Sequence, residues 1–182
     1  MIITKVEDFN VAFFKILGMM PKKVKILTYG LYAGILDNGK DINSWKQTGT
    51  KLILDEIKEF NINCEIIVGI PEYISCKERI DCDDCIIKHN KLVERIKKTA
   101  ELYSSIKWHF VDRMHIKGYI FEFEDKDIAL LGSRNFSDSG YEEAIIKIKP
   151  ADASHLKEMF KDTRDRAVSL SKIDSFKINR NL

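Results

Sequence analysis

The stretch from His115 to Glu143 constrains the fold of this chain more than any other part of its sequence. His115 and Lys117 open an apolar run that continues to Phe123, and a second apolar run follows at 128–131 after a charged turn. Side chains alternate between the faces of a strand, so His115 and Lys117 are expected to point the same way. The two runs predict a hairpin with polar groups gathered at one end.

The second run leads into Gly-Ser-Arg-Asn, in which Ser133 and Asn135 are two residues apart. The hairpin would therefore bring an imidazole, an ammonium, a hydroxyl and an amide into one patch. Lys117 supplies a positive charge and three donors, and Ser133 and Asn135 supply neutral donors, a set that suits the non-bridging oxygens of a phosphate. His115 is the group able to attack phosphorus or to move a proton near neutral pH.

This pattern resembles the HKD motif of the phospholipase D superfamily, HxK(x)4D(x)6GSxN. His115, Lys117, Ser133 and Asn135 match it by type and order. The Asp of the motif falls on Glu122, and the longer gap to the Gly-Ser pair predicts a longer hairpin turn.

The resemblance implies further features of the site and of the assembly. The acidic residue of the family downstream of GSxN would be Glu143, with Glu142 as the neighbouring candidate. Family enzymes use two HKD histidines, and this chain supplies one such motif, so the resemblance implies a homodimer with a shared site. It also implies an α/β fold, a phospholipase D-like α/β/α sandwich around a mixed sheet, and catalysis without a cofactor.

The HxK triplet alone is not specific, because two more triplets begin at His89 and His155 in helix-like sequence. A second interpretation of His115 therefore stays open. A strand histidine can be partly buried and bonded to a backbone carbonyl, and Gly-Ser-Arg-Asn can be an ordinary turn.

Hydrophobic periodicity predicts alternating helices and strands over the whole chain, taken as one domain of 182 residues with a Cys-rich insert at about 72–90. A strand, a helix and a strand between 24 and 69 predict a parallel crossover. In the closing helix, Asp152 is expected to be the cap, and the polar tail from Ser171 is expected to fray. The predicted helices are about 6–20, 53–60, 84–104 and a closing helix from the Asp152 cap to about 167, and the predicted strands are 24–29, 64–69, 106–111, 115–123, 128–131 and 144–148.

A cluster of Cys and His has the spacing of metal ligands. Cys82 and Cys85 form a CxxC pair, and His89 follows Cys85 by one helical turn. With Cys76 they would make a tetrahedral Cys3His set, which suits a structural zinc. The other interpretation is a reduced loop whose thiols bind nothing, and both stay open.

Basic side chains repeat at helical spacing at Lys88, Lys91, Arg95 and Lys98. Such a stripe is most often a solvated helix face, and the second interpretation is a track for phosphate backbones, together with Arg134 of the motif. Because the net charge is only +2, a nucleic-acid partner would have to bind a local patch.

The sequence has no apolar run long enough to span a bilayer and no typical secretory signal, so a cytoplasmic protein is expected. The single motif, the small size of the chain and the basic stripe together favour a metal-independent nuclease that forms a phosphohistidine. Two alternatives stay open. One is a phospholipase or phosphatidyltransferase, and the other is an inactive nucleic-acid-binding module of the same fold.

Overall fold

The computed structural model describes residues 2–3, 6–31, 49–71, 83–112, 114–132 and 145–178. These residues form four α-helices, a 3-10 helix and eight strands. The helices are α1 (Val6–Leu17), α2 (Gly49–Glu59), α3 (Asp83–Leu102), α4 (Pro150–Arg166) and the 3-10 helix η2 (Leu170–Phe176). The strands are β1 (Ile2–Ile3), β2 (Lys23–Tyr29), β3 (Asn63–Ile70), β4 (Lys107–Asp112), β5 (Lys117–Glu122), β6 (Asp127–Gly132), β7 (Ile145–Ile148) and β8 (Val168–Ser169).

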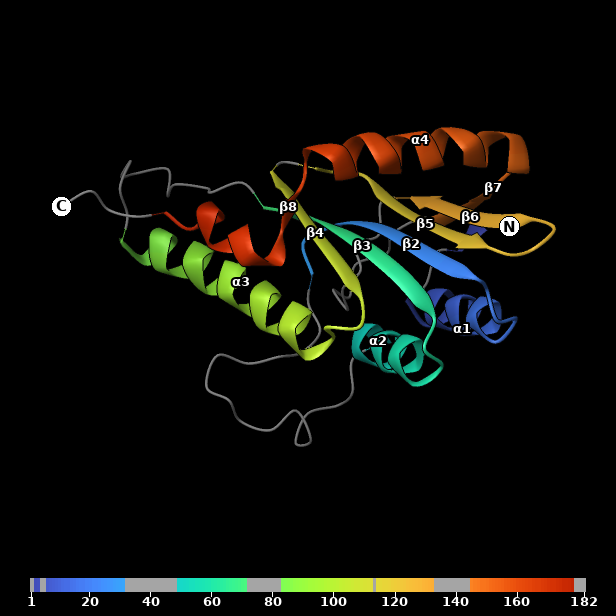
Figure 1. Ribbon diagram of the computed structural model, residues 1–182, viewed down its shortest axis with the longest axis horizontal. Helices are drawn as coiled ribbons and strands as arrows, with labels where there is room; N and C mark the ends of the chain where they lie inside the picture. The colour runs from blue at the N-terminus through green and yellow to red at the C-terminus, as the bar shows by residue number, and fades with distance from the viewer. Residues whose placement is uncertain are drawn as a thin grey trace.

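All eight strands belong to one sheet in the order β1-β7-β6-β5-β2-β3-β4-β8. The pairs β2–β3 and β3–β4 are parallel, and the other neighbours are antiparallel. Helix α4 covers one face of the sheet, and α1, α2 and α3 cover the other (Figure 1). The predicted α/β/α sandwich around a mixed sheet and the predicted parallel pairing of β2 with β3 are confirmed.

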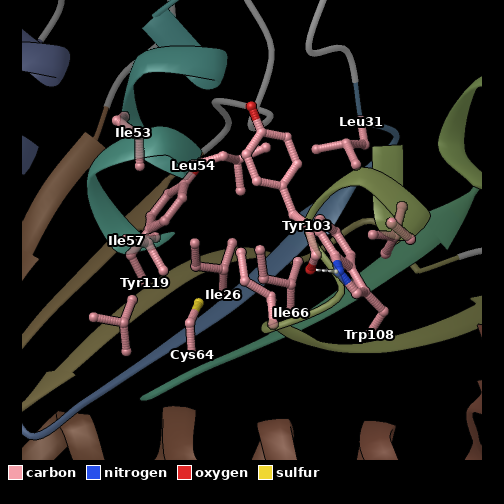
Figure 2. Packing of buried hydrophobic residues seen from close by; sticks show 14 of the residues in the cluster. Ile26, Leu31, Ile53, Leu54, Ile57, Cys64, Ile66, Tyr103, Trp108 and Tyr119 are labelled. Atoms are coloured by element: carbon pink, nitrogen blue, oxygen red, sulfur yellow. Dashed lines mark hydrogen bonds between the residues drawn. The ribbon is translucent and has the colours of Figure 1, made fainter. Parts of the chain in front are cut away.

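The two faces of the sheet carry separate apolar cores because alternate side chains of each strand point to opposite sides. Ile26 and Ile66 pack toward α1 and α2, whereas Leu27 and Ile67 pack toward α4. In the larger of the two cores, which contains Ile26 and Ile66, the indole nitrogen of Trp108 donates a hydrogen bond of 3.0 Å to the Tyr103 carbonyl (Figure 2). The helix residues of this core are at most 2% exposed: Phe9, Phe13 and Leu17 of α1, and Val93, Ile96 and Ala100 of α3.

Asp152 is not the cap that the sequence predicts, and the helix predicted at 53–60 ends at Glu59. Helix α4 begins at Pro150 with Lys149 as the capping residue, so Asp152 lies inside the first turn and is not the cap. Phe60 lies in the turn after α2 and is 48% exposed, because the helix ends one residue before it. Met159 is 39% exposed on α4, where Leu156 and Phe160 form the buried face.

The expectation that the tail frays from Ser171 is also wrong as far as Ile178. Residues 170–176 form η2, whose Ile173 is fully buried. The segment that follows is held by Asn90, which donates to the Ile178 carbonyl at 3.1 Å and accepts from its amide at 2.9 Å. One apolar anchor and one side-chain amide therefore order a segment whose composition is polar. Within the described part of the chain, no helix is both long and apolar enough to cross a membrane.

A buried carboxylate connects the sheet to α4. Glu65 of β3 is 5% exposed, and it accepts hydrogen bonds from Lys23 at 2.8 Å and from His109 at 2.9 Å. Arg164 of α4 lies 3.9 Å from the same carboxylate. Burial raises the pKa of Glu65, but the hydrogen bonds and charges of Lys23 and His109 together lower it by more than burial raises it. The net pKa therefore lies below the ordinary 4.5.

This balance predicts an acid-sensitive contribution to stability. Because the pKa of Glu65 is lower in the folded state than its ordinary 4.5, the stabilisation is complete above that value and is lost as the pH falls through the folded pKa. At neutral pH, Glu65→Gln should lower the free energy of unfolding by about 1–3 kcal/mol, since the half-buried donors Lys23 and His109 lose a charged acceptor. Urea unfolding at decreasing pH should show this difference shrinking below about pH 4.5. A difference that stays constant with pH would contradict the prediction, and Glu158→Gln, at an exposed position, is the control.

Candidate active site

The start of β5 lies beside the end of β2. The two strands are antiparallel with Leu27 opposite Gly118, so Lys117 and the residues before it lie at the carboxyl end of β2. Strand β3 is parallel to β2, with Gly69 opposite Tyr29, so its carboxyl end lies at the same edge of the sheet. In open α/β sheets, ligands bind outside the carboxyl ends of the parallel strands.

Tyr29 brings His115 and Lys117 together at this edge. The imidazole of His115 stacks on the Tyr29 ring, with the centroids 4.0 Å apart and the planes inclined by 22°. The ammonium of Lys117 lies 5.3 Å from the centroid of the same ring. His115 is exposed and Lys117 is half-buried. The expectation that the two side chains lie on one side of the chain is therefore confirmed, and the imidazole is open to solvent.

The backbone that carries His115 passes directly over β3. A Cβ at Gly69 would lie 2.4 Å from the Met114 carbonyl oxygen and 3.1 Å from Met114 Cβ. Real Cβ atoms do not approach backbone that closely, so only glycine fits at position 69 with Met114 where it is. A glycine within an apolar strand is the sequence signal for such a close approach of backbone.

The hairpin aligns the two halves of the motif. Lys117 is opposite Gly132 in the β5–β6 register, so Ser133 follows in sequence the residue that pairs with Lys117. The strands pair evenly from Lys117 to Glu122, and the turn is closed by a hydrogen bond of 2.9 Å from the Phe123 amide to the Lys126 carbonyl. The predicted residues beyond the hairpin lie outside the described part of the chain: Ser133, Arg134, Asn135, Glu142 and Glu143.

Glu122, at the position of the motif's Asp, lies at the opposite end of β5 from Lys117. It accepts a hydrogen bond of 2.7 Å from Lys25, and the Lys157 ammonium of α4 lies 3.3 Å away. Lys157 also pairs with Asp127 across the hairpin. Burial raises the pKa of Glu122, but Lys25 and Lys157 together lower it by more than burial raises it. The pKa of Glu122 therefore lies below its ordinary value. The carboxylate therefore stabilises the contact of the sheet with α4 and does not contact His115.

The basic stripe belongs to α3. Lys88 and Lys91 are exposed, and Arg95 and Lys98 are half-buried. Helix α3 follows β3 and precedes the parallel strand β4, so it runs back from the edge where His115 lies (Figure 1). Its first turns, with Lys88 and Lys91, are thus at the end of the helix nearer to that edge.

The described part of the Cys-rich segment, 83–90, forms the first turns of α3. His89 donates a hydrogen bond of 2.9 Å from Nε2 to the Phe176 carbonyl, an arrangement also common for zinc-binding histidines. Cys76 and Cys82 lie outside the described residues, whereas Cys85 is half-buried one turn before His89. Among the described residues, no group of three or more His, Cys, Asp or Glu side chains is placed to hold a metal, and the zinc site stays a prediction.

No protein-family model and no curated protein matches the sequence. Solved structures do resemble the fold. Phosphatidylserine synthase from Haemophilus influenzae Rd KW20 matches with a TM-score of 0.64 and 12% identity, over 98% of this chain and 40% of that one. Polyphosphate kinase from Porphyromonas gingivalis matches with a TM-score of 0.52 and 12% identity, over 90% of this chain and 25% of that one.

A third similar structure, the archaeal chromatin protein TrmBL2, has a TM-score of 0.47 and 11% identity, over 93% of this chain and 53% of that one, which is too weak a likeness to support an argument. This chain spans about half or less of each of these proteins. At such identities the likeness shows the fold alone. The chain has a phospholipase D-like fold, as the sequence predicts.

The position of Glu122 predicts that stability and activity can be separated. Glu122→Gln should lower the free energy of unfolding by about 1–2 kcal/mol, because Lys25 and Lys157 lose a charged acceptor. It should leave the activity expected at the His115 edge unchanged per folded molecule, since Glu122 and Lys117 are at opposite ends of β5, about 16 Å apart at the usual rise per residue. Urea unfolding and turnover should be measured on the same preparation. Glu124→Gln, at an 85% exposed carboxylate paired with Lys22, is the matched control and should change neither quantity by much. A specific loss of turnover in Glu122→Gln would contradict the structural role.

Proposed function

We propose that this protein is a metal-independent phosphodiesterase that cleaves nucleic acid through a phosphohistidine intermediate. The observation that supports this most directly is the exposed imidazole of His115, which shares the Tyr29 ring with the Lys117 ammonium at the edge of the sheet where ligands bind. A nucleophile and a cation held side by side suit attack on a phosphate whose charge must be neutralised as the transition state forms.

The reaction proceeds in two displacements. The neutral imidazole of His115 attacks phosphorus, so that an N–P bond forms as the P–O bond to the leaving oxygen breaks. A second imidazole, protonated, gives its proton to that oxygen. Water then attacks phosphorus, the N–P bond breaks, and the second imidazole accepts the proton of the water. In this scheme, Lys117 offsets the charge of the non-bridging oxygens, Ser133 and Asn135 would donate hydrogen bonds to them, and Glu143 would orient an imidazole.

The second imidazole comes from a symmetry-related copy of the chain. The sequence contains four histidines, and the three besides His115 have other neighbours. His109 bonds to Glu65, His89 bonds to the Phe176 carbonyl, and His155 lies 3.5 Å from Glu158 on the surface of α4. A twofold homodimer supplies the missing imidazole as the partner's His115, and the two rings then act in opposite protonation states.

Nucleic acid is the substrate that the charge distribution favours. The basic stripe on α3 begins at the end of the helix nearer to the His115 edge, and two of its lysines are exposed. Phosphate backbones are bound by such local basic surfaces even when the net charge is small. The solved structure with a TM-score of 0.64 is named a phosphatidylserine synthase, so a phospholipid substrate is the alternative that the assay must separate.

The proposal predicts cleavage of an oligonucleotide or plasmid in excess EDTA and its loss in His115→Ala. Removal of a residue that forms the covalent intermediate should lower kcat by at least about a thousandfold. A phosphoenzyme should be trapped in the wild type by acid-free quenching with labelled oligonucleotide, and it should be missing in the variant. Dye release from phospholipid vesicles is measured in parallel.

His155→Ala is the matched control, because His155 also begins an HxK triplet but its side chain is 80% exposed on α4. It should retain full cleavage. Vesicle release without nucleic-acid cleavage would favour the phospholipid alternative. Retention of nucleic acid without cleavage would favour an inactive binding module. Activity that disappears in EDTA while the fold is intact would contradict the metal-independent route.

The basic stripe predicts how binding depends on salt. In a His115→Ala background, Lys88→Gln together with Lys91→Gln should weaken retention of a duplex. It should also reduce the slope of log affinity against log salt by about 1–2, since each phosphate contact contributes about 0.9. Fluorescence anisotropy at several salt concentrations measures both quantities.

The control removes the same charge elsewhere. Lys15→Gln together with Lys126→Gln changes two exposed lysines of α1 and the hairpin turn, and it should leave the salt slope unchanged. Equal weakening by both double variants would show that net charge, and not the stripe on α3, determines binding.

A further inference from the structure

Tyr29 and Gly69 are neither ligands of a phosphate nor part of the HxK pattern, yet both contact the segment that carries His115. They are register partners at the carboxyl ends of the parallel strands β2 and β3. We propose that they form a platform, the Tyr29–Gly69 platform, that fixes the position of the His115 imidazole and of the Lys117 ammonium relative to each other. This inference rests on the proposed function for its kinetic consequence, but its geometric part can be tested without turnover.

The Tyr29 half of the platform acts through its ring. A phenol ring stacked on the imidazole at 4.0 Å restricts both the tilt and the rotation of His115, whose side chain is otherwise exposed. The same ring attracts the Lys117 ammonium, 5.3 Å from its centroid, by a cation–π interaction. One rigid side chain therefore sets the positions of two flexible ones. The ring is the active part, so a phenylalanine should replace it.

The Gly69 half acts through the backbone. The Met114 carbonyl occupies the space that a Cβ at Gly69 would fill, at 2.4 Å. This close approach sets the height of residues 114–116 above the sheet, and so the height at which His115 meets Tyr29. Gly30, which follows Tyr29 in sequence, has a φ of +72°. Its amide donates a hydrogen bond of 2.8 Å to the Gly69 carbonyl. That bond ties the end of β2 to the end of β3, so the two halves of the platform move together.

A positioning role has a kinetic signature that differs from a loss of stability. Displacement of a catalytic group by about 1 Å can cost on the order of a hundredfold in rate, whereas substrate binding by more distant groups is retained. Tyr29→Leu should therefore lower kcat about tenfold to a hundredfold, with a smaller change in KM. Tyr29→Phe should keep most of the activity. Gly69→Ala, which touches neither His115 nor Lys117, should lower kcat as well.

The geometric readout is the NMR signal of the His115 ring protons. The sequence contains four histidines, so a carbon-correlated spectrum of histidine-labelled protein is simple, and His115→Ala identifies the signal. A ring stacked on a phenol is shielded, so the His115 protons should be shifted upfield in the wild type and in Tyr29→Phe. That shift should disappear in Tyr29→Leu and change in Gly69→Ala. Gly18→Ala is the control for the glycine, because a Cβ there would lie at an ordinary 3.4 Å from its nearest neighbour, the Phe14 carbonyl oxygen.

The outcomes separate the platform from the proposed activity. If the wild type cleaves no phosphodiester but the shielded signal is present and is lost in Tyr29→Leu, the proposed function fails and the platform stands. If the wild type cleaves nucleic acid while Tyr29→Leu has the same kcat and the same His115 signal, the platform is overturned and the function stands. A Gly69→Ala variant that fails to fold leaves the test to the Tyr29 pair, whose ring-dependent difference supports or overturns the inference alone.

Discussion

The register of β5 between β2 and β6 is the constraint on which the candidate site depends. A slip of one residue would exchange the two faces of the strand, and the register is fixed on both faces. On one side, Tyr119 packs against Phe9 with ring centroids 5.2 Å apart. On the other, a Cβ at Gly118 would lie 2.8 Å from Leu156 Cδ1 of α4, so a larger residue there would displace the Leu156 side chain. The large side chain of Tyr119 on one face and the missing side chain of Gly118 on the other thus fix the register, and the register determines the position of Lys117.

The charged contacts of the sheet with α4 are separate from the candidate site. Glu65 lies near the start of β3 and Glu122 at the end of β5, and each is bonded to lysines or histidine on the α4 side of the sheet. Their charges hold α4 in place, and α4 in turn contacts β5 through Leu156 and Gly118. The site therefore depends on these contacts through strand register, while His115 itself is exposed and Lys117 and Tyr29 are half-buried. This division explains how Glu122 can replace an aspartate of the motif without reaching the imidazole.

The sequence predicts the layers, the hairpin and the convergence of His115 with Lys117 because these follow from local periodicity and from a motif. It does not predict Tyr29, because the stacking partner of His115 comes from a strand that is distant in sequence and adjacent only through the sheet. The two-residue strands β1 and β8 are too short to show alternation. The order of the tail to Ile178 depends on Asn90, a single polar side chain of α3, and composition gives no sign of it.

An exposed histidine stacked on an aromatic ring is not by itself evidence of catalysis, and the surrounding groups decide its interpretation. A structural histidine at a sheet edge would be expected to bond to a carbonyl or a carboxylate, as His89 and His109 do in this chain. His115 is instead supported on its face by Tyr29, while a lysine shares the same ring and a glycine admits the backbone beneath it. Tyr29 of β2 and Gly69 of β3, both distant in sequence, thus contact the segment that carries an imidazole exposed to solvent. Holding a solvated side chain in this way contributes little to stability, and the proposed role of His115 as a nucleophile at a phosphate would require it.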